Sequence, residues 1–257
     1  MDLTIEYTKR DALAILTLQK PPANGYDIDM LTLLATYITE IEADLQVKVV
    51  QVRSSNARFF SAGADIKVFG SNTTEQNTAM VVAARRASDL IQHSSKIYVA
   101  AIQGHALGGG LELAMACDIR LAAEGTYAIG LPEVKLGLMP GNGGAVRLID
   151  LIGKSRALEL LLTGDSISPQ QAYAYGLFTK LYPEATFGQE VEQYLATLAL
   201  GAGQAMAAIK RFSRLSMGLD QQQGLALEKE CVDRLYDTED AVEGFKAFIE
   251  KRNPNYK

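Results

Sequence analysis

Two glutamates in this chain have surroundings that suit proton transfer. Glu112 follows a run of glycines and lies one helical turn beyond Gly109, and Glu133 follows Pro132 in an otherwise apolar segment. A carboxylate beside a free backbone N–H donor suits a reaction that builds an oxyanion and moves a proton. A glutamate in the first turn of a helix is also common for structural reasons alone. Taken one at a time, neither residue decides between these explanations.

The glycine run, Gly108–Gly110, is predicted to connect a buried strand to a helix. Residues 97–102 form a short apolar run, and residues 111–116 favour a helix. A helix that begins at such a turn has unpaired backbone N–H groups that stabilise negative charge, and glycine lets a ligand approach them. The residues that follow exclude a phosphate-binding P-loop and a dinucleotide fingerprint. A turn that only permits close helix packing would share this pattern.

A second candidate donor lies in the segment 61–67, where small residues follow two phenylalanines. Gly63 would free the turn, the N–H of Ala64 would face outward, and a helix would begin near Asp65 and Ile66. A purely structural loop is the better explanation of this segment when it is considered alone.

The elements that would position these residues alternate between strands and helices, in the order β-β-α-β at the start. Strands are predicted at 3–8, 12–18, 47–52, 97–102, 117–123, 127–130 and 177–182, and helices at about 30–41, 78–92, 111–116, 145–152, 155–162, 186–200, 203–217, 220–235 and 239–251. Asp27 or Asp29 would cap the first helix, and Ser168 followed by Pro169 would start another. Residues 71–77 are predicted to be a mobile polar segment, and 131–144 to lack regular structure.

Composition narrows the class of protein. The chain has 257 residues, 48% of them apolar and 21% charged, which is ordinary for a globular protein of one large domain. A formal net charge of −5 gives no general attraction to nucleic acid or to an anionic membrane. Cys117 and Cys231 are too far apart for a metal motif, so both are expected to be free thiols. No apolar run is long enough to span a membrane, and a cytoplasmic location is expected.

Four motifs, in this order, resemble those of the crotonase (enoyl-CoA hydratase/isomerase) superfamily over essentially the whole chain. They are residues 61–67 (SAGADIK), 104–114 (GHALGGGLELA), 131–137 (LPEVKLG) and 140–144 (PGNGG). The resemblance implies an α/β fold of the ClpP/crotonase type. Residues 1–195 would form a spiral of ββα units that holds the active site, and residues 196–257 a helical trimerisation region. It also implies a homotrimer or a homohexamer.

The same resemblance implies an acyl-CoA thioester as substrate and neither a metal nor a redox cofactor. The family's oxyanion hole, two peptide N–H groups that bind the thioester oxygen, falls on Ala64 and Gly109. The family's catalytic pair falls on Glu112, which would activate water toward Cβ, and Glu133, which would deliver a proton to Cα. The residues that would bind the CoA portion of the substrate are Ala62, Asp65, Ile66 and Lys67.

Both glutamates favour a hydratase over the other activities of the superfamily. A Δ3-Δ2 enoyl-CoA isomerase commonly keeps only the carboxylate that matches Glu133, so isomerase or a pathway-specific dehydratase is the alternative. An RNA-binding member without catalysis fits less well with the acidic charge and intact glutamates. The chain departs from the usual family pattern at Tyr26 and at Asn142, which bears on acyl-chain specificity. Phe248 and Lys251 lie where members can touch a neighbour's CoA, and a plain surface position is the alternative.

Overall fold

Two β-sheets form the framework of the molecule, and the computed structural model describes residues 4–256. The larger sheet has the order β1-β2-β3-β5-β7-β10, and the smaller has the order β4-β6-β8-β9. Strands of the larger sheet are β1 (Ile5–Arg10), β2 (Leu13–Leu18), β3 (Val49–Ser54), β5 (Ile97–Ile102), β7 (Ile119–Ala123) and β10 (Lys180–Tyr182). Those of the smaller sheet are β4 (Phe59–Ser61), β6 (His105–Leu107), β8 (Ile129–Gly130) and β9 (Ser166–Ile167). The first predicted strand started at Leu3, which lies outside the described residues.

The larger sheet is parallel except at one edge, where β1 and β2 form an antiparallel hairpin. Every residue of its central strand β5 is buried. A parallel sheet covered on both faces needs such continuously apolar strands, which explains why the apolar run at 97–102 predicted β5 correctly. β4, β6 and β9 were not predicted, because strands of two or three residues are too short to show a periodicity.

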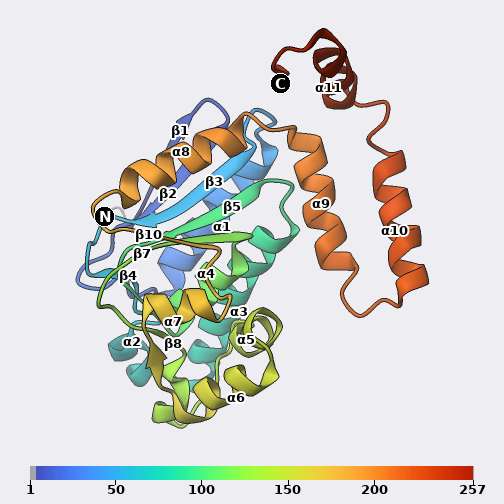
Figure 1. Cartoon of the computed structure of the whole chain (residues 1–257). Helices are drawn as coiled ribbons and strands as arrows, with labels where there is room; N and C mark the ends of the chain where they lie inside the picture. The colour runs from blue at the N-terminus through green and yellow to red at the C-terminus, as the bar shows by residue number, and fades with distance from the viewer. Residues whose placement is uncertain (1–3, 257) are drawn as a thin grey trace.

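Helices cover both faces of the larger sheet (Figure 1). In chain order they are α1 (Ile28–Ala43), α2 (Ile66–Ser71), α3 (Thr74–His93), α4 (Gly109–Ala116), the 3₁₀ helix η1 (Pro132–Leu136), α5 (Gly144–Ile152), α6 (Lys154–Thr163), α7 (Pro169–Ala174), α8 (Phe187–Ala199), α9 (Gly203–Leu215), α10 (Gln221–Asp233) and α11 (Glu239–Glu250). Neighbouring residues of β3 point to opposite faces, so Val50 joins the core beneath α1 and α3 whereas Val49 packs with α8.

Local sequence explains several helix starts. The carboxylate of Asp27 accepts a hydrogen bond from the Met30 N–H at 3.0 Å and so caps α1, as one of the two predicted alternatives required. Ser168 caps α7 with Pro169 in the first turn, as predicted. The segment 131–144, predicted to be irregular, contains the short helix η1.

The prediction of a mobile segment at 71–77 was wrong. Helix α3 already begins at Thr74, four residues before the predicted start. The hydroxyl of Thr73 accepts a hydrogen bond from the Gln76 N–H, and the Gln76 side chain accepts one from the Thr73 N–H. This reciprocal capping satisfies two N–H groups at the helix start and fixes the polar residues that follow in helical structure.

The last three helices project away from the two sheets (Figure 1). The division predicted between residues 195 and 196 falls inside α8, whose Phe187, Val191 and Leu195 pack against the larger sheet. The projecting part therefore starts at α9. No helix between residues 4 and 256 is both long enough and apolar enough to cross a membrane.

A buried lysine attaches α9 to the rest of the molecule. The Lys210 ammonium lies 2.8 Å from the carboxylate of Asp118 and donates to the carbonyl oxygens of Ile91 and Lys96, also at 2.8 Å. It also lies 5.1 Å from the centre of the Tyr98 ring. Burial outweighs the attraction of this ammonium and raises the pKa of Asp118. The ammonium thus has partners only while α9 is seated.

We expect Lys210→Met to lower the free energy of unfolding by about 3 kcal/mol, because it leaves Asp118 buried without its partner. Urea unfolding at a fixed protein concentration measures this loss. Lys229→Met is the matched control, because Lys229 pairs with Asp233 on the exposed surface of α10, where solvent screens the attraction and the pair contributes little to stability. Equal losses in the two variants would contradict a special role for Lys210.

Candidate active site

Three neighbouring parallel strands direct the predicted site residues to one edge of the smaller sheet. β4 and β8 both pair in parallel with β6, so the carboxyl ends of all three lie side by side. The loop with Ala64 follows β4, the glycine run follows β6, and Glu133 follows β8. Ligands of open parallel sheets bind at the carboxyl ends of the strands. The sheet therefore assembles one site from residues far apart in the chain.

The backbone of Ala64 lies beside that of Tyr26, and the Ala64 N–H group points away from Tyr26. Tyr26 pairs with Ala64 in an isolated parallel bridge. The bridge uses the Gly63 carbonyl, which accepts from the Tyr26 N–H, and the Asp65 N–H, which donates to the Tyr26 carbonyl. The N–H of Ala64 is left to point the other way. Gly63 permits this turn because its φ is +86°, a value that side chains disfavour.

Gly109 is the first residue of α4, so its N–H is one of those that the helix cannot pair. The two candidate donor loops touch, since a Cβ added to Gly63 would lie 2.8 Å from the Gly109 nitrogen. The N–H groups of Ala64 and Gly109 thus belong to adjacent loops at one helix N-terminus. That position favours a developing negative charge.

Glu112 is only 3% exposed and is held by the backbone. Its Oε1 accepts hydrogen bonds from the N–H groups of Asn142 and Gly144, both at 2.8 Å. Gly144 is the first residue of α5, so this carboxylate also caps that helix. Burial raises the pKa of Glu112, and the two donors with the Arg147 and Arg85 charges oppose that rise. The donors favour an ionised Glu112, which is the form that a base needs.

The loop that holds Glu112 is itself fixed by two arginines. Arg147 donates to the carbonyl oxygen of Asn142 at 2.6 Å, and Arg85 donates to that of Gly141 at 2.7 Å. Helices α5 and α3 therefore set the position of the donors that orient Glu112.

Glu133 has the opposite character. Its Oε1 lies beside the glycine run, 3.1 Å from where a Cβ of Gly108 would be, and its buried Oε2 has no hydrogen-bond partner within residues 4–256. Burial, followed by the charge of Glu112, raises the pKa of Glu133 to about 7. A carboxyl group with such a pKa keeps its proton in a large share of molecules at neutral pH and can act as an acid.

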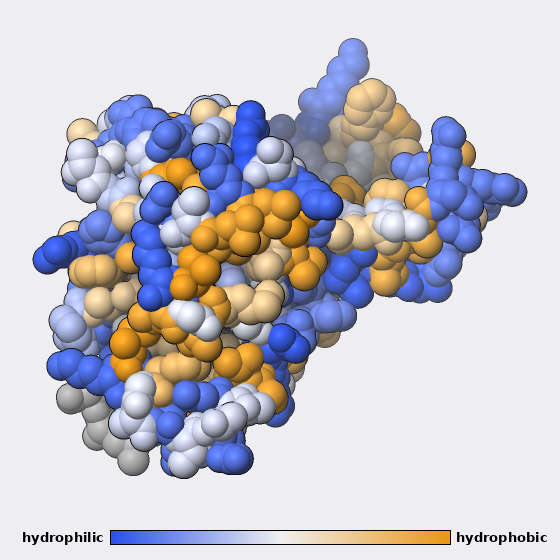
Figure 2. Space-filling view, turned by 90° about the horizontal axis from the view of Figure 1, so that it is seen from below, coloured by the Kyte–Doolittle hydropathy of each residue, from blue (hydrophilic) through white to orange (hydrophobic). Residues whose placement is uncertain are grey.

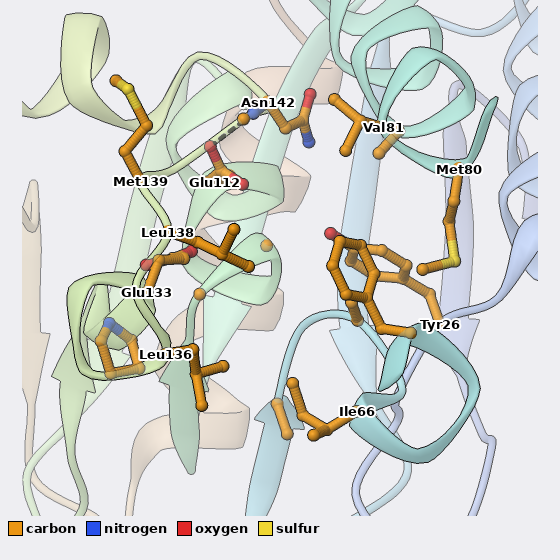
Figure 3. A pocket seen from close by; sticks show the side chains of 18 residues that line it. Tyr26, Ile66, Met80, Val81, Glu112, Glu133, Leu136, Leu138, Met139 and Asn142 are labelled. Carbon is orange, nitrogen blue, oxygen red and sulfur yellow. Dashed lines mark hydrogen bonds between the residues drawn. The ribbon is translucent and has the colours of Figure 1, made fainter. Parts of the chain in front are cut away.

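A cavity of about 220 Å³ brings these groups together (Figure 3). It is lined by Tyr26, Ala62, Ala64, Ile66, Phe69, Met80, Val81, Ala84, Gly108, Gly109, Glu112, Pro132, Glu133, Leu136, Leu138, Met139, Gly141 and Asn142. Figure 3 shows Glu112 and Glu133 on one wall and Tyr26 on the facing wall. Apolar side chains also cover much of the surface at this end of the molecule (Figure 2), and exposed Leu136 and Met139 contribute to the lining.

Of the residues predicted to bind the CoA portion, the structure places two in the cavity and two beside it. Ala62 and Ile66 line the cavity, and Ile66 is 56% exposed. Asp65 caps α2, since its carboxylate accepts hydrogen bonds from the N–H groups of Lys67 and Val68. The Lys67 side chain is exposed on that helix.

Sequence reasoning missed the wall that α3 contributes. Met80, Val81 and Ala84 line the cavity, but the sequence predicted only a helix there, with no part in a site. The backbone donors of Asn142 and Gly144 to Glu112 were missed as well. The closely spaced glycines at 141–144 were a visible signal for that turn, although not for its partner.

Comparisons with known proteins agree with this geometry. A family model described as enoyl-CoA hydratase/isomerase matches residues 8–257. A probable enoyl-CoA hydratase of Bacillus subtilis is 37% identical to the chain and aligned over 95% of both proteins. The 2,3-dehydroadipyl-CoA hydratase of Escherichia coli is 36% identical over 97% of both.

Solved structures extend the likeness to the fold. The crystal structure of an enoyl-CoA hydratase from Bacillus anthracis superposes with a TM-score of 0.95, at 33% identity and over 99% of both chains. The predicted crotonase-like α/β fold is therefore confirmed.

Proposed function

Because the chain belongs to the enoyl-CoA hydratase/isomerase family, we propose that it adds water reversibly to the double bond of 2-enoyl-CoA thioesters. The observation that carries the proposal is one cavity that holds two carboxyl groups and two backbone N–H donors. The backbone fixes the Glu112 carboxylate, whereas the buried Oε2 of Glu133 has no partner among the described residues. Hydration requires a base for water, an acid for Cα and a site for the enolate oxygen, and this cavity supplies all three. The reaction needs only protein groups and water.

In the proposed reaction, the N–H groups of Ala64 and Gly109 bind the thioester oxygen and stabilise the negative charge that develops on it. Glu112, whose ionised form is favoured by its two backbone donors, takes a proton from the attacking water while the oxygen bonds to Cβ. Glu133 gives its proton to Cα, and the enolate returns to a thioester. Much of the cavity lining is apolar, which strengthens each of these interactions.

The buried, backbone-held Glu112 favours hydration over double-bond isomerisation. Isomerisation moves one proton between two carbons and needs a single carboxyl group, for which Glu133 would suffice. The test is the loss of the absorbance of a conjugated 2-enoyl-CoA on incubation with the protein, followed by identification of the 3-hydroxyacyl product. Conversion of a 3-enoyl-CoA without any hydration of the 2-enoyl-CoA would overturn the proposal.

We expect kcat/KM for hydration to fall as the pH rises through about 7. The pKa of Glu133 is raised to about 7, and its protonated form is the acid, so that form is lost on the alkaline side. A fall approaching tenfold per pH unit above that point is the expected limit. Initial rates at low substrate concentration between pH 6 and 9 measure it. Constant activity up to pH 9 would contradict this role for Glu133.

The parts of CoA beyond the thioester would lie at the mouth of the cavity. Ala62 and Ile66 would contact the pantetheine arm, Asp65 would hold the start of α2 in place, and Lys67 would offer its charge to a phosphate of the nucleotide.

The helices after α8 would form the trimerisation region. Large apolar side chains are exposed on α9, α10 and α11, including Ile209, Leu225, Val242, Phe245, Phe248 and Ile249. Light scattering is expected to give three or six times the 27.8 kDa of one chain, and a monomer at micromolar concentration would contradict this. In such an assembly, Phe248 and Lys251 would be candidates to contact a neighbour's CoA.

A further inference from the structure

Two polar side chains in the cavity have no part in the proposed reaction. They belong to Tyr26 and Asn142, which line it together with the two glutamates. The remaining side chains of the wall next to them are apolar, mainly those of Met80, Val81 and Ala84 on α3. A pocket for a plain hydrocarbon chain gains nothing from a phenol and an amide, because each polar group loses its water when the chain binds.

Of the two side chains, that of Asn142 has the buried polar atom without a hydrogen-bond partner in the described part of the chain. The residue is 4% exposed, and its side-chain oxygen has no hydrogen-bond partner among the described residues. Its backbone N–H donates to Glu112, so its side chain begins close to the carboxylate of the proposed base. Figure 3 shows the amide extending from Glu112 toward Val81 along the cavity. A buried amide without partners is costly unless a ligand or water satisfies it.

Tyr26 faces the same space from the opposite wall. Its ring packs on the glycine run, and a Cβ added to Gly109 would lie only 1.8 Å from its hydroxyl oxygen. Burial and the charges of Glu112 and Glu133 raise the pKa of this phenol, so it stays protonated and can donate a hydrogen bond. In Figure 3 the hydroxyl points into the cavity.

We propose, building on the hydratase function above, that the substrate is a 2-enoyl-CoA with a hydroxyl substituent just beyond the double bond, which Tyr26 and Asn142 bind. A hydroxyl fits, because it can accept from the phenol and donate to the side-chain oxygen of Asn142, which has no partner among the described residues. A carboxylate is disfavoured by the two nearby glutamates.

The test compares two substrates of equal size. 4-Hydroxybut-2-enoyl-CoA and pent-2-enoyl-CoA differ only in a hydroxyl or a methyl group at the end of the chain. We expect the wild-type protein to hydrate the hydroxylated substrate with at least tenfold higher kcat/KM. In Tyr26→Phe and in Asn142→Ala, the ratio of the two kcat/KM values should fall about 5- to 10-fold, the usual effect of one lost hydrogen bond.

Both substitutions spare the surroundings of the reaction. Phenylalanine keeps the ring against Gly109, and alanine keeps the backbone N–H that holds Glu112. Tyr173→Phe is the matched control, because Tyr173 is half exposed on α7 and outside the cavity; its ratio should equal that of the wild type. Thermal melting of each variant checks that folding is intact.

The possible outcomes separate the two proposals. If the wild-type protein hydrates neither substrate nor any other 2-enoyl-CoA, the hydratase function itself fails. If it hydrates both and the ratio is the same in wild type and variants, only the substrate class is overturned. If a variant loses activity equally on both substrates, its side chain serves the attacking water or the oxyanion, and that also overturns the proposed specificity.

Discussion

Glu112→Gln is expected to lower kcat/KM for hydration of a short 2-enoyl-CoA by about 10²- to 10⁴-fold, the usual contribution of a general base. The fold should survive, because the amide oxygen of glutamine can still accept from the N–H groups of Asn142 and Gly144. What disappears is the ability to take a proton from water. Glu133→Gln should cause a loss of similar size for the opposite reason, since it removes the proton that Cα receives.

A matched surface substitution shows whether the loss belongs to the site. Glu40→Gln changes an exposed residue of α1 in the same way and should leave the rate unaltered. In Glu112→Gln, slow conversion of a 3-enoyl-CoA can persist, because Glu133 alone can move a proton between two carbons. Full hydration activity in either Glu112→Gln or Glu133→Gln would refute the assigned roles.

Gly109→Ala is expected to lower hydration by about 10²- to 10³-fold, the cost of losing one oxyanion donor. The added Cβ would lie 1.8 Å from the hydroxyl oxygen and 2.5 Å from Cζ of Tyr26. Either the Tyr26 ring or the start of α4 must move. If the start of α4 moves, the N–H of Gly109 moves with it and no longer faces the thioester oxygen. Steady-state kinetics together with a thermal melt separate a displaced donor from an unfolded protein.

The cause can be tested by removing the obstacle. Tyr26→Leu shortens the facing side chain, so the double variant Gly109→Ala/Tyr26→Leu should recover at least tenfold over Gly109→Ala alone on an unsubstituted substrate. Gly110→Ala is the comparison, because its Cβ would lie 2.3 Å from the carbonyl oxygen of Ser61. That clash involves backbone, so Tyr26→Leu should not relieve it. Recovery in both backgrounds, or in neither, would contradict the steric explanation.

Much of the fold could be predicted where the chain carries a local signal. The run 97–102 predicted β5, the glycines after it predicted the start of α4, and Asp27 and Ser168 predicted two caps. The start of α3 was predicted too late, although Thr73 and Gln76 form a recognisable capping pair. The boundary predicted at residue 195 ignored the apolar face that seats α8 on the sheet.

The site could be predicted only in part, because its geometry depends on contacts between distant segments. Resemblance to the family selected Glu112 and Glu133, yet nothing in their spacing of 21 residues (133 − 112) places them in one cavity. That results from the parallel pairing of β6 with β8, a strand of two residues. The contribution of Met80 and Val81 depends likewise on how α3 lies against the glycine run.

Asn142 combines two tasks on different parts of one residue. Its main-chain N–H donates to Glu112, the proposed base, whereas its side chain lines the cavity in which we propose that the acyl group binds. Every amino acid except proline has that main-chain N–H, so the identity of residue 142 can change while the proton chemistry is preserved. Evolution, or a protein engineer, could therefore retune which acyl groups are accepted at this single codon without rebuilding the catalyst.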